Sequence, residues 1–239
     1  KLLAGIDDYD LSSLRQCVSA GEHLPLPTFE DWYAATGIKL IDGFGATEMI
    51  HVFVTSAGDD IRPGATGRAA PGYRVAVLGD DGRALPAGEP GRLAVKGPTG
   101  CRYLDDNRQR DYVLGGWNIT GDICRLDDAG YVWYLGRGDD MIISAGYNIS
   151  GPEVEAALLP HPAVSECAVV GAGDAERGTI VKAFVVLSEG SQASEELTAE
   201  LKEFVKQRIA PYKYPRAIQF VDALPLTKTG KIQRFKLRT

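Results

Sequence analysis

The stretch from Gly67 to Arg137 constrains the fold most, because it consists of short β-type runs separated by turn residues. Two Asp-rich turns that end in glycine, at 80–82 and 127–130, have the residues typical of hairpins. The segment 86–91 contains two prolines and two glycines and is expected to form a tight loop. The pattern predicts a small β-barrel or a distorted sheet.

The residues before this stretch follow a strand–helix–strand pattern. A short apolar-rich run at 14–18 precedes an amphipathic helix predicted over 27–36, and a strand starts at 38–41. Phe29, Trp32 and Tyr33 are expected to face inward, and Gly37 to end the helix. This pattern is typical of an α/β fold, and it predicts the last unit of a larger sheet.

A third pattern begins after Asp139. Pro152 is expected at the first position of a helix that continues over 153–159. Strands are predicted at 168–170, 182–187 and 217–221, with a helix over 195–208 between the last two. That helix has Leu197, Leu201, Phe204 and Val205 on one face. The pattern predicts a compact α+β module of about 100 residues.

Composition excludes several classes of protein. The chain has 239 residues, of which 44% are hydrophobic and 24% charged, as in ordinary globular proteins. It has no uninterrupted apolar window of roughly 18 residues, so no membrane span is expected, and no leader that would predict secretion. Cys17, Cys101, Cys124 and Cys167 lack metal-ligand spacing, which argues against a zinc site and favours thiols of a cytoplasmic protein.

Charge is distributed unevenly along the chain. The net charge is −6, but residues 204–239 contain nine Lys or Arg and one acid, which gives +8 there and −14 in the rest. A basic end on an acidic body suggests a polyanionic partner. Nucleic acid, a phosphorylated small molecule and an ordinary solvated surface are all compatible with this charge.

A glycine-rich motif, GFGATE, runs from Gly43 to Glu48 directly after a predicted strand. Its glycines allow the backbone to turn tightly and approach a ligand, while Thr47 and Glu48 supply a hydroxyl and a carboxylate. Such a pair can hold a phosphate oxygen and its Mg²⁺. A plain strand-to-loop turn is the alternative.

Two further motifs lie near Asp139, where the run of short β-type segments gives way to the predicted α+β module. The turn Thr120–Asp122 offers one carboxylate, which is suited to vicinal sugar hydroxyls but is often only structural. The segment from Gly136 to Ile149 is charged and rich in glycine, and it begins with Arg137. It contains the connection between domains, as a functional hinge or as an ordinary linker.

The last motif places Lys231 in a glycine loop within TKTGKIQR, residues 227–234. A lysine on such a loop can neutralise charge that develops on a carboxylate or phosphate. It is not a Walker loop, because no glycine lies five residues before Gly230 and Ile232 follows the lysine. A solvated surface lysine is the alternative.

Taken in order, these motifs resemble the serial core motifs of the adenylate-forming superfamily, which includes acyl- and aryl-CoA synthetases, peptide-synthetase adenylation domains and luciferases. The resemblance spans nearly the whole chain. It implies a fold of three parts: the end of a large α/β domain (1–62), its β-barrel subdomain (63–138) and a small mobile C-terminal α+β domain (139–239). The segments that carry it are Ser19–Glu22, Gly43–Glu48, Thr120–Asp122, Gly136–Asn148 and Thr229–Lys231.

The resemblance also implies roles for individual residues in unit 1–138. Thr47 would bind the AMP phosphate, Glu48 would hold Mg²⁺, and Asp122 would take the ribose hydroxyls, with Arg137 also at the nucleotide. The residues implied along the adenine and its surroundings are Ser19, Ala20, Gly21, Glu22, Asp42, Gly43 and Phe44.

In the small domain the implied roles follow a two-step reaction. Adenylation of a carboxylate by ATP expels pyrophosphate, and the thiol of CoA then displaces AMP. Lys231 would bind the carboxylate and the α-phosphate in the first step, and Asp139 would be the hinge about which the domain swings. Gly146 and Tyr147 would lie where the pantetheine arm enters in the second step.

Within the superfamily, residues 42–51, 97–103 and 144–153 resemble the benzoate and 2-aminobenzoate CoA ligases, with 2-aminobenzoate favoured as substrate. The resemblance implies that Phe44, Gly45 and His51 touch the aromatic ring, although His51 can equally pack beside its loop. The Ser/Thr/Gly-rich phosphate loop of the family has no counterpart in these residues. We therefore expect a fragment that does not adenylate by itself.

The expected partners are a small carboxylic acid, ATP and CoA, without nucleic acid or membrane. A homodimer is left open, and the expected location is the cytoplasm. One alternative is another adenylate-forming enzyme, such as a fatty acyl-CoA synthetase or a carrier-protein loading domain. The chain ends soon after Lys231 with no carrier domain attached. A non-catalytic fragment that binds nucleic acid is the other alternative, although no basic stripe with interleaved aromatics supports it.

Overall fold

The computed structural model describes residues 3–174 and 178–238. Contacts between backbone positions divide the chain into two units, Lys1–Gly138 and Asp139–Thr239. Among the described residues, none of the helices combines the length and hydropathy that crossing a membrane requires. All four cysteines are free thiols, with Cys124 and Cys167 buried.

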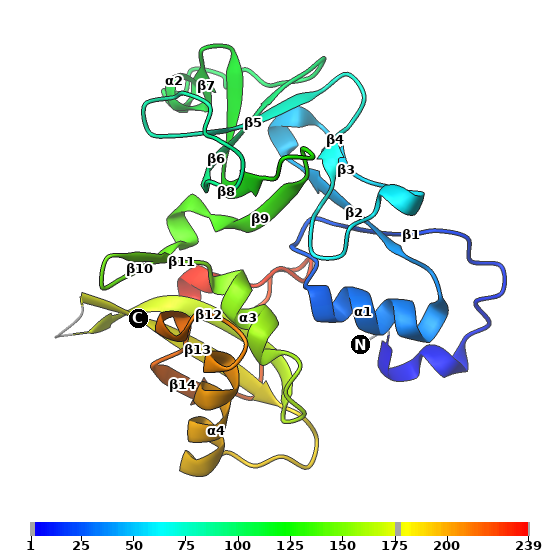
Figure 1. Ribbon diagram of the computed structural model, residues 1–239, viewed down its shortest axis with the longest axis vertical. Helices are drawn as coiled ribbons and strands as arrows, with labels where there is room; N and C mark the ends of the chain where they lie inside the picture. Colours follow the sequence, from blue (N-terminus) through cyan, green and yellow to red (C-terminus); the bar gives the residue numbers. More distant parts are fainter. Residues whose placement is uncertain (1–2, 175–177, 239) are drawn as a thin grey trace. The chain divides into compact units, whose positions relative to one another are not determined.

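The first unit begins with a mixed four-stranded sheet (Figure 1). Strand β1 runs parallel to β2, with helix α1 between them in the chain, and β3 and β4 continue the sheet in antiparallel fashion. Short 3-10 helices η1, η2 and η3 lie in the connections. The bounds are η1 Leu3–Asp8, β1 Cys17–Ala20, α1 Leu26–Thr36, β2 Leu40–Gly45, η2 Thr47–Met49, β3 Val52–Thr55, η3 Gly58–Asp60 and β4 Arg68–Ala69.

Helix α1 packs one face against β2 and ends as the sequence predicts. Gly37 caps the helix with φ of 69°, a left-handed conformation that glycine adopts without strain. Phe29 and Trp32 are buried, but the inward position predicted for Tyr33 is wrong, because its side chain is 46% exposed. Tyr33 only stacks at the rim on Phe29, with ring centroids 6.5 Å apart, where its hydroxyl can stay in water.

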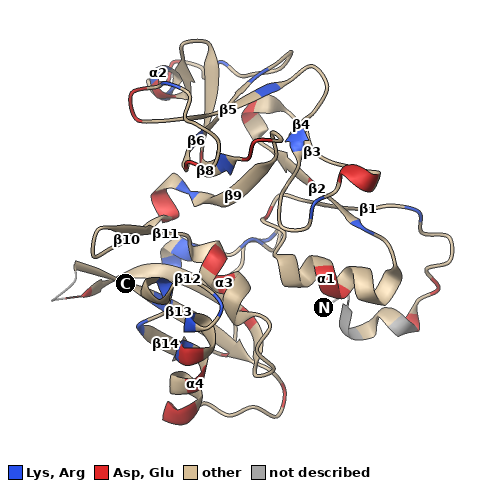
Figure 2. Ribbon diagram, in the orientation of Figure 1, with Lys and Arg blue, Asp and Glu red and all other residues tan. Residues whose placement is uncertain are grey.

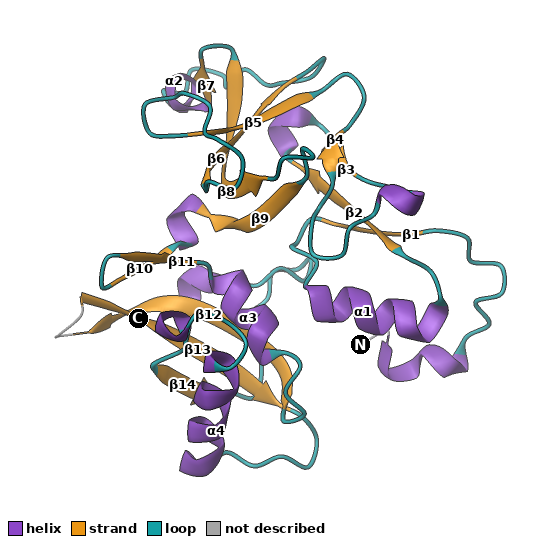
Figure 3. Cartoon of the chain, in the orientation of Figure 1, coloured by secondary structure: helices purple, strands orange, loops and turns teal. Residues whose placement is uncertain are grey.

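A five-stranded antiparallel sheet, the half-barrel, forms the rest of this unit (Figure 3). The long strand β8 pairs with β6 along one edge and with β7 and β9 along the other, and β5 pairs with β6. The turns predicted at 80–82 and 127–130 are present, and backbone hydrogen bonds from Gly79 N to Arg83 O over 2.9 Å and from Asp127 N to Tyr131 O over 3.0 Å close them. The bounds are β5 Arg74–Leu78, β6 Gly91–Lys96, α2 Arg108–Tyr112, β7 Val113–Leu114, β8 Trp117–Leu126 and β9 Val132–Arg137.

One apolar cluster joins the two sheets of the first unit. Residues of η2 and β3 pack directly against residues of β5, β6, β8 and β9. The four-stranded sheet and the half-barrel are therefore held together by a shared core. Its buried members are Met49, Phe53, Val54, Val77, Leu93, Val95, Cys124 and Val132.

The second unit is an α+β module around a three-stranded sheet, with β13 between antiparallel β12 and parallel β14. A hairpin of β10 and β11 precedes it. The bounds are η4 Gly138–Asp140, β10 Ile142–Ser144, β11 Tyr147–Ile149, α3 Gly151–Leu158, β12 Val164–Asp174, β13 Gly178–Leu187, α4 Glu195–Lys206, η5 Pro211–Lys213, β14 Ala217–Phe220 and η6 Arg234–Lys236.

Both faces of this sheet are covered by apolar side chains, as alternation along β12 and β13 requires. Val169 and Val185 lie in a cluster with Leu158 of α3 and Leu201 of α4. Ala168 and Phe184 point the other way, into a smaller cluster that Leu224 and Leu237 complete. The unit thus has a core on each side of its sheet.

Two boundary predictions for this unit need correction. Helix α3 begins at Gly151, where the Ser150 hydroxyl accepts a hydrogen bond from Glu153 N over 3.2 Å, so Pro152 takes the second helical position instead of the first. Strands β12 and β13 are 11 and 10 residues long, far beyond the predicted 168–170 and 182–187. Gly171 and Gly173 interrupt the apolar pattern but pair in the ladder, which extends the strands.

Candidate functional site

The parallel pairing of β1 and β2 brings two predicted motifs side by side. Ser19 lies opposite Asp42, and Ala20 opposite Gly43, so the segments Ser19–Glu22 and Asp42–Glu48 leave the same edge of the sheet. Gly21 turns the chain there with φ of 90°. The carboxyl ends of parallel strands are where open α/β sheets bind their ligands.

The glycines of the motif Gly43–Glu48 allow the chain to fold back so that its backbone at His51 lies close to Gly45. A Cβ atom on Gly45 would lie 2.7 Å from the carbonyl oxygen of His51, a separation that only a backbone shift could relieve. The returning segment forms η2, on which Thr47 is exposed and Glu48 half-buried. Ile50 ends the turn at φ of 71°.

Glu48 is held by a residue that the sequence did not identify. Tyr103, in the loop after β6, donates its hydroxyl hydrogen to Glu48 Oε1 over 2.6 Å. This hydrogen bond is the main cause that raises the pKa of Tyr103 to about 12, so the phenol stays protonated and keeps donating at neutral pH. Arg108 lies 4.6 Å from the centre of the Tyr103 ring. No described residue forms a hydrogen bond with the second carboxylate oxygen, Oε2.

Phe44 packs inward from the motif. Its ring makes an edge contact with Phe53 at 5.5 Å and a tilted contact with Tyr134 at 6.0 Å between centroids. Tyr134, on β9, also stacks on His23 at 5.4 Å. These contacts bring β9 against the ends of β1 and β2. The two other residues assigned to the acyl pocket, Gly45 and His51, are exposed.

Asp122 and Arg137 face each other across β8 and β9. They occupy paired positions in the ladder, and Arg137 Nη1 lies 3.5 Å from Asp122 Oδ1. The same nitrogen donates to the carbonyl oxygen of Thr120 over 3.1 Å. Gly121 leaves room for the guanidinium because an added Cβ would lie 3.1 Å from Arg137 Nη2. Asp122 is buried, so its carboxylate is fixed in direction by the strand.

Asp42 is a half-buried carboxylate on β2, opposite Ser19 of β1. Burial raises the pKa of Asp42 to about 6, although hydrogen bonds from the Thr66 hydroxyl and Gly43 N oppose the shift. It borders a small cavity that Leu24, Phe29 and Arg62 also line. The carboxylate form is therefore the less favoured one in the folded protein at mildly acidic pH.

We expect Asp42→Asn to raise the free energy of unfolding at pH 8 by about 1–3 kcal/mol. The folded pKa lies above the unfolded value of 3.8, so stability present below about pH 4 is lost as pH rises through about 6. Asparagine removes the ionisation and keeps an oxygen for Gly43 N. Urea unfolding followed by tryptophan fluorescence reports on the first unit, because Trp32, Trp117 and Trp133 all lie there. A difference of equal size at pH 4 and pH 8 would contradict the assignment.

In the second unit, Lys231 lies at the end of a tight loop. Thr227 N donates to the Lys231 carbonyl oxygen over 2.8 Å, and Lys231 N donates to the Thr227 hydroxyl over 2.9 Å. Gly230 has φ of 88°, which closes the turn. The Lys231 side chain is exposed and makes no ion pair with any residue that the structure describes.

The β10–β11 hairpin carries Gly146 and Tyr147. Ala145 and Gly146 both have positive φ, 49° and 82°, as a two-residue type I′ turn requires. Tyr147 stacks on Tyr212 with centroids 4.3 Å apart, and both rings are about half exposed, at 51% and 43%. Asp139 is exposed within η4, at the start of this unit.

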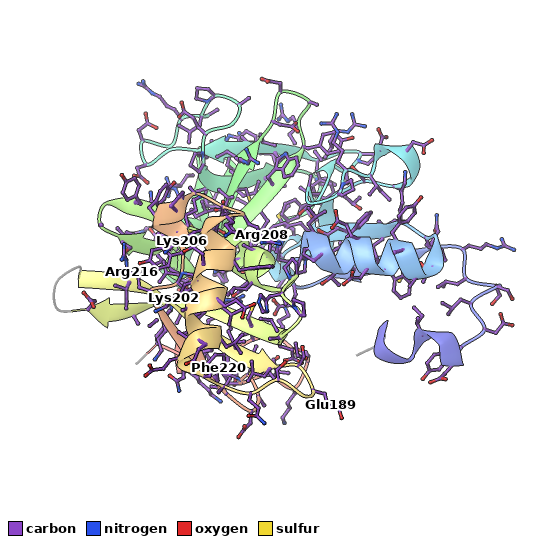
Figure 4. The ribbon with its side chains drawn as sticks, turned by 60° about the horizontal axis from the view of Figure 1, so that its bottom comes forward. Glu189, Lys202, Lys206, Arg208, Arg216 and Phe220 are labelled. Atoms are coloured by element: carbon purple, nitrogen blue, oxygen red, sulfur yellow. The ribbon has the colours of Figure 1, made fainter. Side chains whose placement is uncertain are left out.

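Several cations of the basic stretch 204–239 pair with acidic side chains or lie over aromatic rings inside the second unit. Lys213 contacts both oxygens of Glu153 at 2.6 and 2.7 Å, and Arg238 pairs with Asp140. Figure 4 labels Lys206 and Arg208 near the end of α4, with Arg216 beside them from the segment before β14. Each of these three cations lies over an aromatic ring, that of Tyr214 or Phe204. In Figure 2, acidic positions on α3 lie close to the basic positions of this unit.

The structure thus gathers the predicted residues of the first unit at the carboxyl ends of β1 and β2 and along β8 and β9. Those of the second unit lie on two loops, except Asp139, which lies in η4. In the part of the chain that it describes, no three acidic, cysteine or histidine side chains group as a metal site. Sequence reasoning missed Tyr103, His23, Tyr134 and Tyr212. Only Tyr103 lay within a segment that had been singled out, residues 97–103.

Comparison with known proteins agrees with the resemblance. Residues 2–103 match the family described as AMP-binding enzyme, and residues 153–231 match the AMP-binding enzyme C-terminal domain. The chain belongs to the AMP-binding, adenylate-forming enzyme family. Both matched domains occur in the expected order, one in each unit.

Individual relatives include CoA ligases. The chain is 44% identical to benzoate–CoA ligase of Thauera aromatica over 95% of its own length and 44% of that protein. It is 45% identical to a mitochondrial acyl-coenzyme A synthetase of Homo sapiens over 97% of its length and 42% of the relative. The chain therefore spans somewhat less than half of the curated relatives that it matches.

Solved structures show the same fold. An anthranilate CoA ligase in complex with anthranoyl-AMP superimposes with a TM-score of 0.92 at 43% identity, over 98% of this chain and 46% of that one. A benzoate CoA ligase from Burkholderia xenovorans LB400 gives a TM-score of 0.87 at 45% identity, over 95% and 46%. The chain is thus a C-terminal part of an acyl-CoA synthetase fold, with mixed sheets and a half-barrel.

Proposed function

We propose that this chain forms the C-terminal part of an AMP-forming aryl-acid:CoA ligase. The observation that carries the proposal is the meeting of Ser19–Glu22 and Asp42–Glu48 at one edge of a parallel strand pair. The intact protein would activate a carboxylate as its acyl-adenylate and then transfer the acyl group to the thiol of CoA. Activation is needed because a carboxylate lacks a good leaving group.

The nucleotide would bind along this edge and on β8 and β9. The backbone of Ser19–Glu22, with Asp42, Gly43 and Phe44, would border the adenine. Thr47 would donate its exposed hydroxyl to the phosphate of AMP. Asp122, held by its strand and by Arg137 at 3.5 Å, would accept hydrogen bonds from the vicinal ribose hydroxyls.

Glu48 would hold Mg²⁺ together with the phosphates of ATP. A single protein carboxylate suits this ion, which commonly keeps water and phosphate oxygens as its other ligands. The donation from Tyr103 to Oε1 over 2.6 Å fixes the carboxylate, and no described residue bonds its other oxygen, Oε2, which fits this role. When bound, the ion would neutralise the negative charge of the phosphates.

The second unit would serve both half-reactions. Lys231 would contact the carboxylate and the α-phosphate during adenylation and withdraw for thioester formation, with Asp139 as the hinge. Gly146 and Tyr147 would then border the pantetheine arm of CoA. An exposed lysine on a closed turn, with no acidic partner among the described residues, suits a group that must meet a ligand.

The proposed acid is aromatic, with 2-aminobenzoate or benzoate as the first choice. The relatives named as benzoate and anthranilate CoA ligases support this, and so does a loop whose exposed Gly45 and His51 follow the ring of Phe44. A mitochondrial acyl-coenzyme A synthetase of similar identity makes an aliphatic acid the competing choice.

The test uses a full-length enzyme, in which the upstream segment found in the relatives precedes this chain. CoA thioester formation with ATP is measured for benzoate, 2-aminobenzoate, hydroxybenzoates and short fatty acids. Turnover of an aromatic acid would support the proposal and name the substrate. Reaction of fatty acids alone would refute the aromatic assignment, and absence of any thioester would refute CoA as the acceptor.

A further inference from the structure

A buried ion pair joins helix α3 to the segment that follows Lys231. Nη2 of Arg234 lies 2.9 Å from both carboxylate oxygens of Glu155. Glu155 Oε1 also accepts the backbone N–H of Val169 on β12 over 2.8 Å. The two side chains are only 17% and 11% exposed, so this is an interior contact and not a surface pair.

The stem of the Lys231 loop, residues 225–226 and 232–233, leads directly into this pair. Leu226 and Ile232 form a β-bridge, and Gln233 N donates to the Pro225 carbonyl oxygen over 2.8 Å. Arg234 follows at once, as the first residue of η6, and Leu237 then enters the smaller apolar cluster of the unit. The stem is thus fastened to the sheet on the side of Arg234.

The tip of the loop, residues 228–231, makes few side-chain hydrogen bonds that could fix its direction. Its side-chain hydrogen bonds are local, with the Thr227 and Thr229 hydroxyls 3.0 Å apart and Lys231 N on the Thr227 hydroxyl. Lys228, Thr229, Gly230 and Lys231 are all exposed. The direction in which the Lys231 side chain leaves the domain is therefore set by the stem and its anchor.

Burying a charge pair is an expensive way to stabilise a fold, because desolvation offsets most of the attraction. Apolar residues of similar volume often serve stability equally well. A charge-assisted contact from one guanidinium nitrogen to both carboxylate oxygens adds what they lack, namely a directional link between two segments. Here the fixed segments are α3 with β12 and the stem of the Lys231 loop.

We propose that Glu155 and Arg234 are positioning residues for Lys231. They touch no substrate. They hold the loop so that the ammonium group of Lys231 meets the carboxylate and phosphate during adenylation. The inference rests on the proposed function of Lys231, and it predicts that loss of the pair damages adenylation and spares thioester formation.

The test first uses this chain as it stands. Arg234→Lys keeps the charge but replaces the guanidinium that reaches Glu155 with a shorter ammonium group, while Glu155→Gln removes the opposite charge. We expect amide hydrogen exchange at Gln233 to accelerate at least tenfold in both variants, with the amides of α4 unchanged. His161→Gln is the matched control, because His161 is buried in the same unit and lies 3.2 Å from Glu200, away from the loop.

The same variants are then assayed in the full-length enzyme, with adenylation and transfer from a preformed acyl-adenylate measured separately. We expect Arg234→Lys and Glu155→Gln to slow adenylation at least tenfold and transfer less than twofold, and His161→Gln to affect neither selectively. Equal slowing of both steps, or unchanged exchange at Gln233, would overturn the inference and leave the pair merely structural. A Lys231→Ala enzyme that adenylates normally would instead refute the proposed function of the lysine itself.

Discussion

Lys231→Ala is expected to reduce the rate of adenylation by about 10²–10³-fold, the loss typical when one preorganised charge-stabilising group is removed. Transfer from a preformed acyl-adenylate to CoA should stay within about twofold, because the proposed second step no longer uses the lysine. Pyrophosphate release measures the first step, and thioester formation from added acyl-adenylate measures the second. Both assays require the full-length enzyme.

Lys228→Ala is the matched control for this experiment. Lys228 is exposed on the same loop, three residues before Lys231, and its replacement removes the same charge from the same surface. If charge near the loop were sufficient, the two variants would behave alike. Equal damage to both half-reactions by Lys231→Ala would count against a role restricted to adenylation.

Gly67→Ala is expected to destabilise the first unit by about 3 kcal/mol or more. A Cβ atom at this position would lie 2.3 Å from the carbonyl carbon of Thr55 and 2.6 Å from Ser56 N, and the backbone has φ of 140°. Gly67 also bridges to Val132 on β9, where Val132 N donates to the Gly67 carbonyl oxygen over 2.7 Å. The clash therefore falls where the four-stranded sheet meets the half-barrel.

Gly82→Ala separates the clash from the conformational cost of positive φ. Gly82 has φ of 76° in the β5–β6 connection, and an added Cβ would meet no atom within 4 Å. Its replacement should cost only about 1–2 kcal/mol. Urea unfolding monitored by tryptophan fluorescence compares the two, and similar midpoints would show that the close approach at Gly67 is not the decisive feature.

Much of the fold could be predicted because its signals are local. Gly37 ended α1, and the turns at 80–82 and 127–130 had residues that admit few other conformations. Tyr33 was misplaced because periodicity gives a side chain its direction but not the depth of the core that receives it. The lengths of β12 and β13 were underestimated for a related reason: ladder pairing sustains them through glycines that weaken the pattern.

The candidate site was predictable as a set of motifs but not as a set of contacts. Glu48 and Tyr103 are 55 residues apart in the chain, and no spacing rule connects them. The residues of two other contacts, the stack of Tyr134 on His23 and the pair of Arg234 with Glu155, are even further apart in sequence. Such contacts depend on how the strands are ordered, which a single sequence does not specify.

The two apolar clusters of the C-terminal unit have a consequence for how such proteins can change. Every residue of these clusters lies between Ile142 and Leu237, so the unit completes its core without any residue before Asp139. Recombination near this junction would exchange the module that carries Lys231 and leave the first unit untouched. If the proposed function holds, selectivity for the acid and the timing of the two half-reactions can diverge independently, by the shuffling of whole modules.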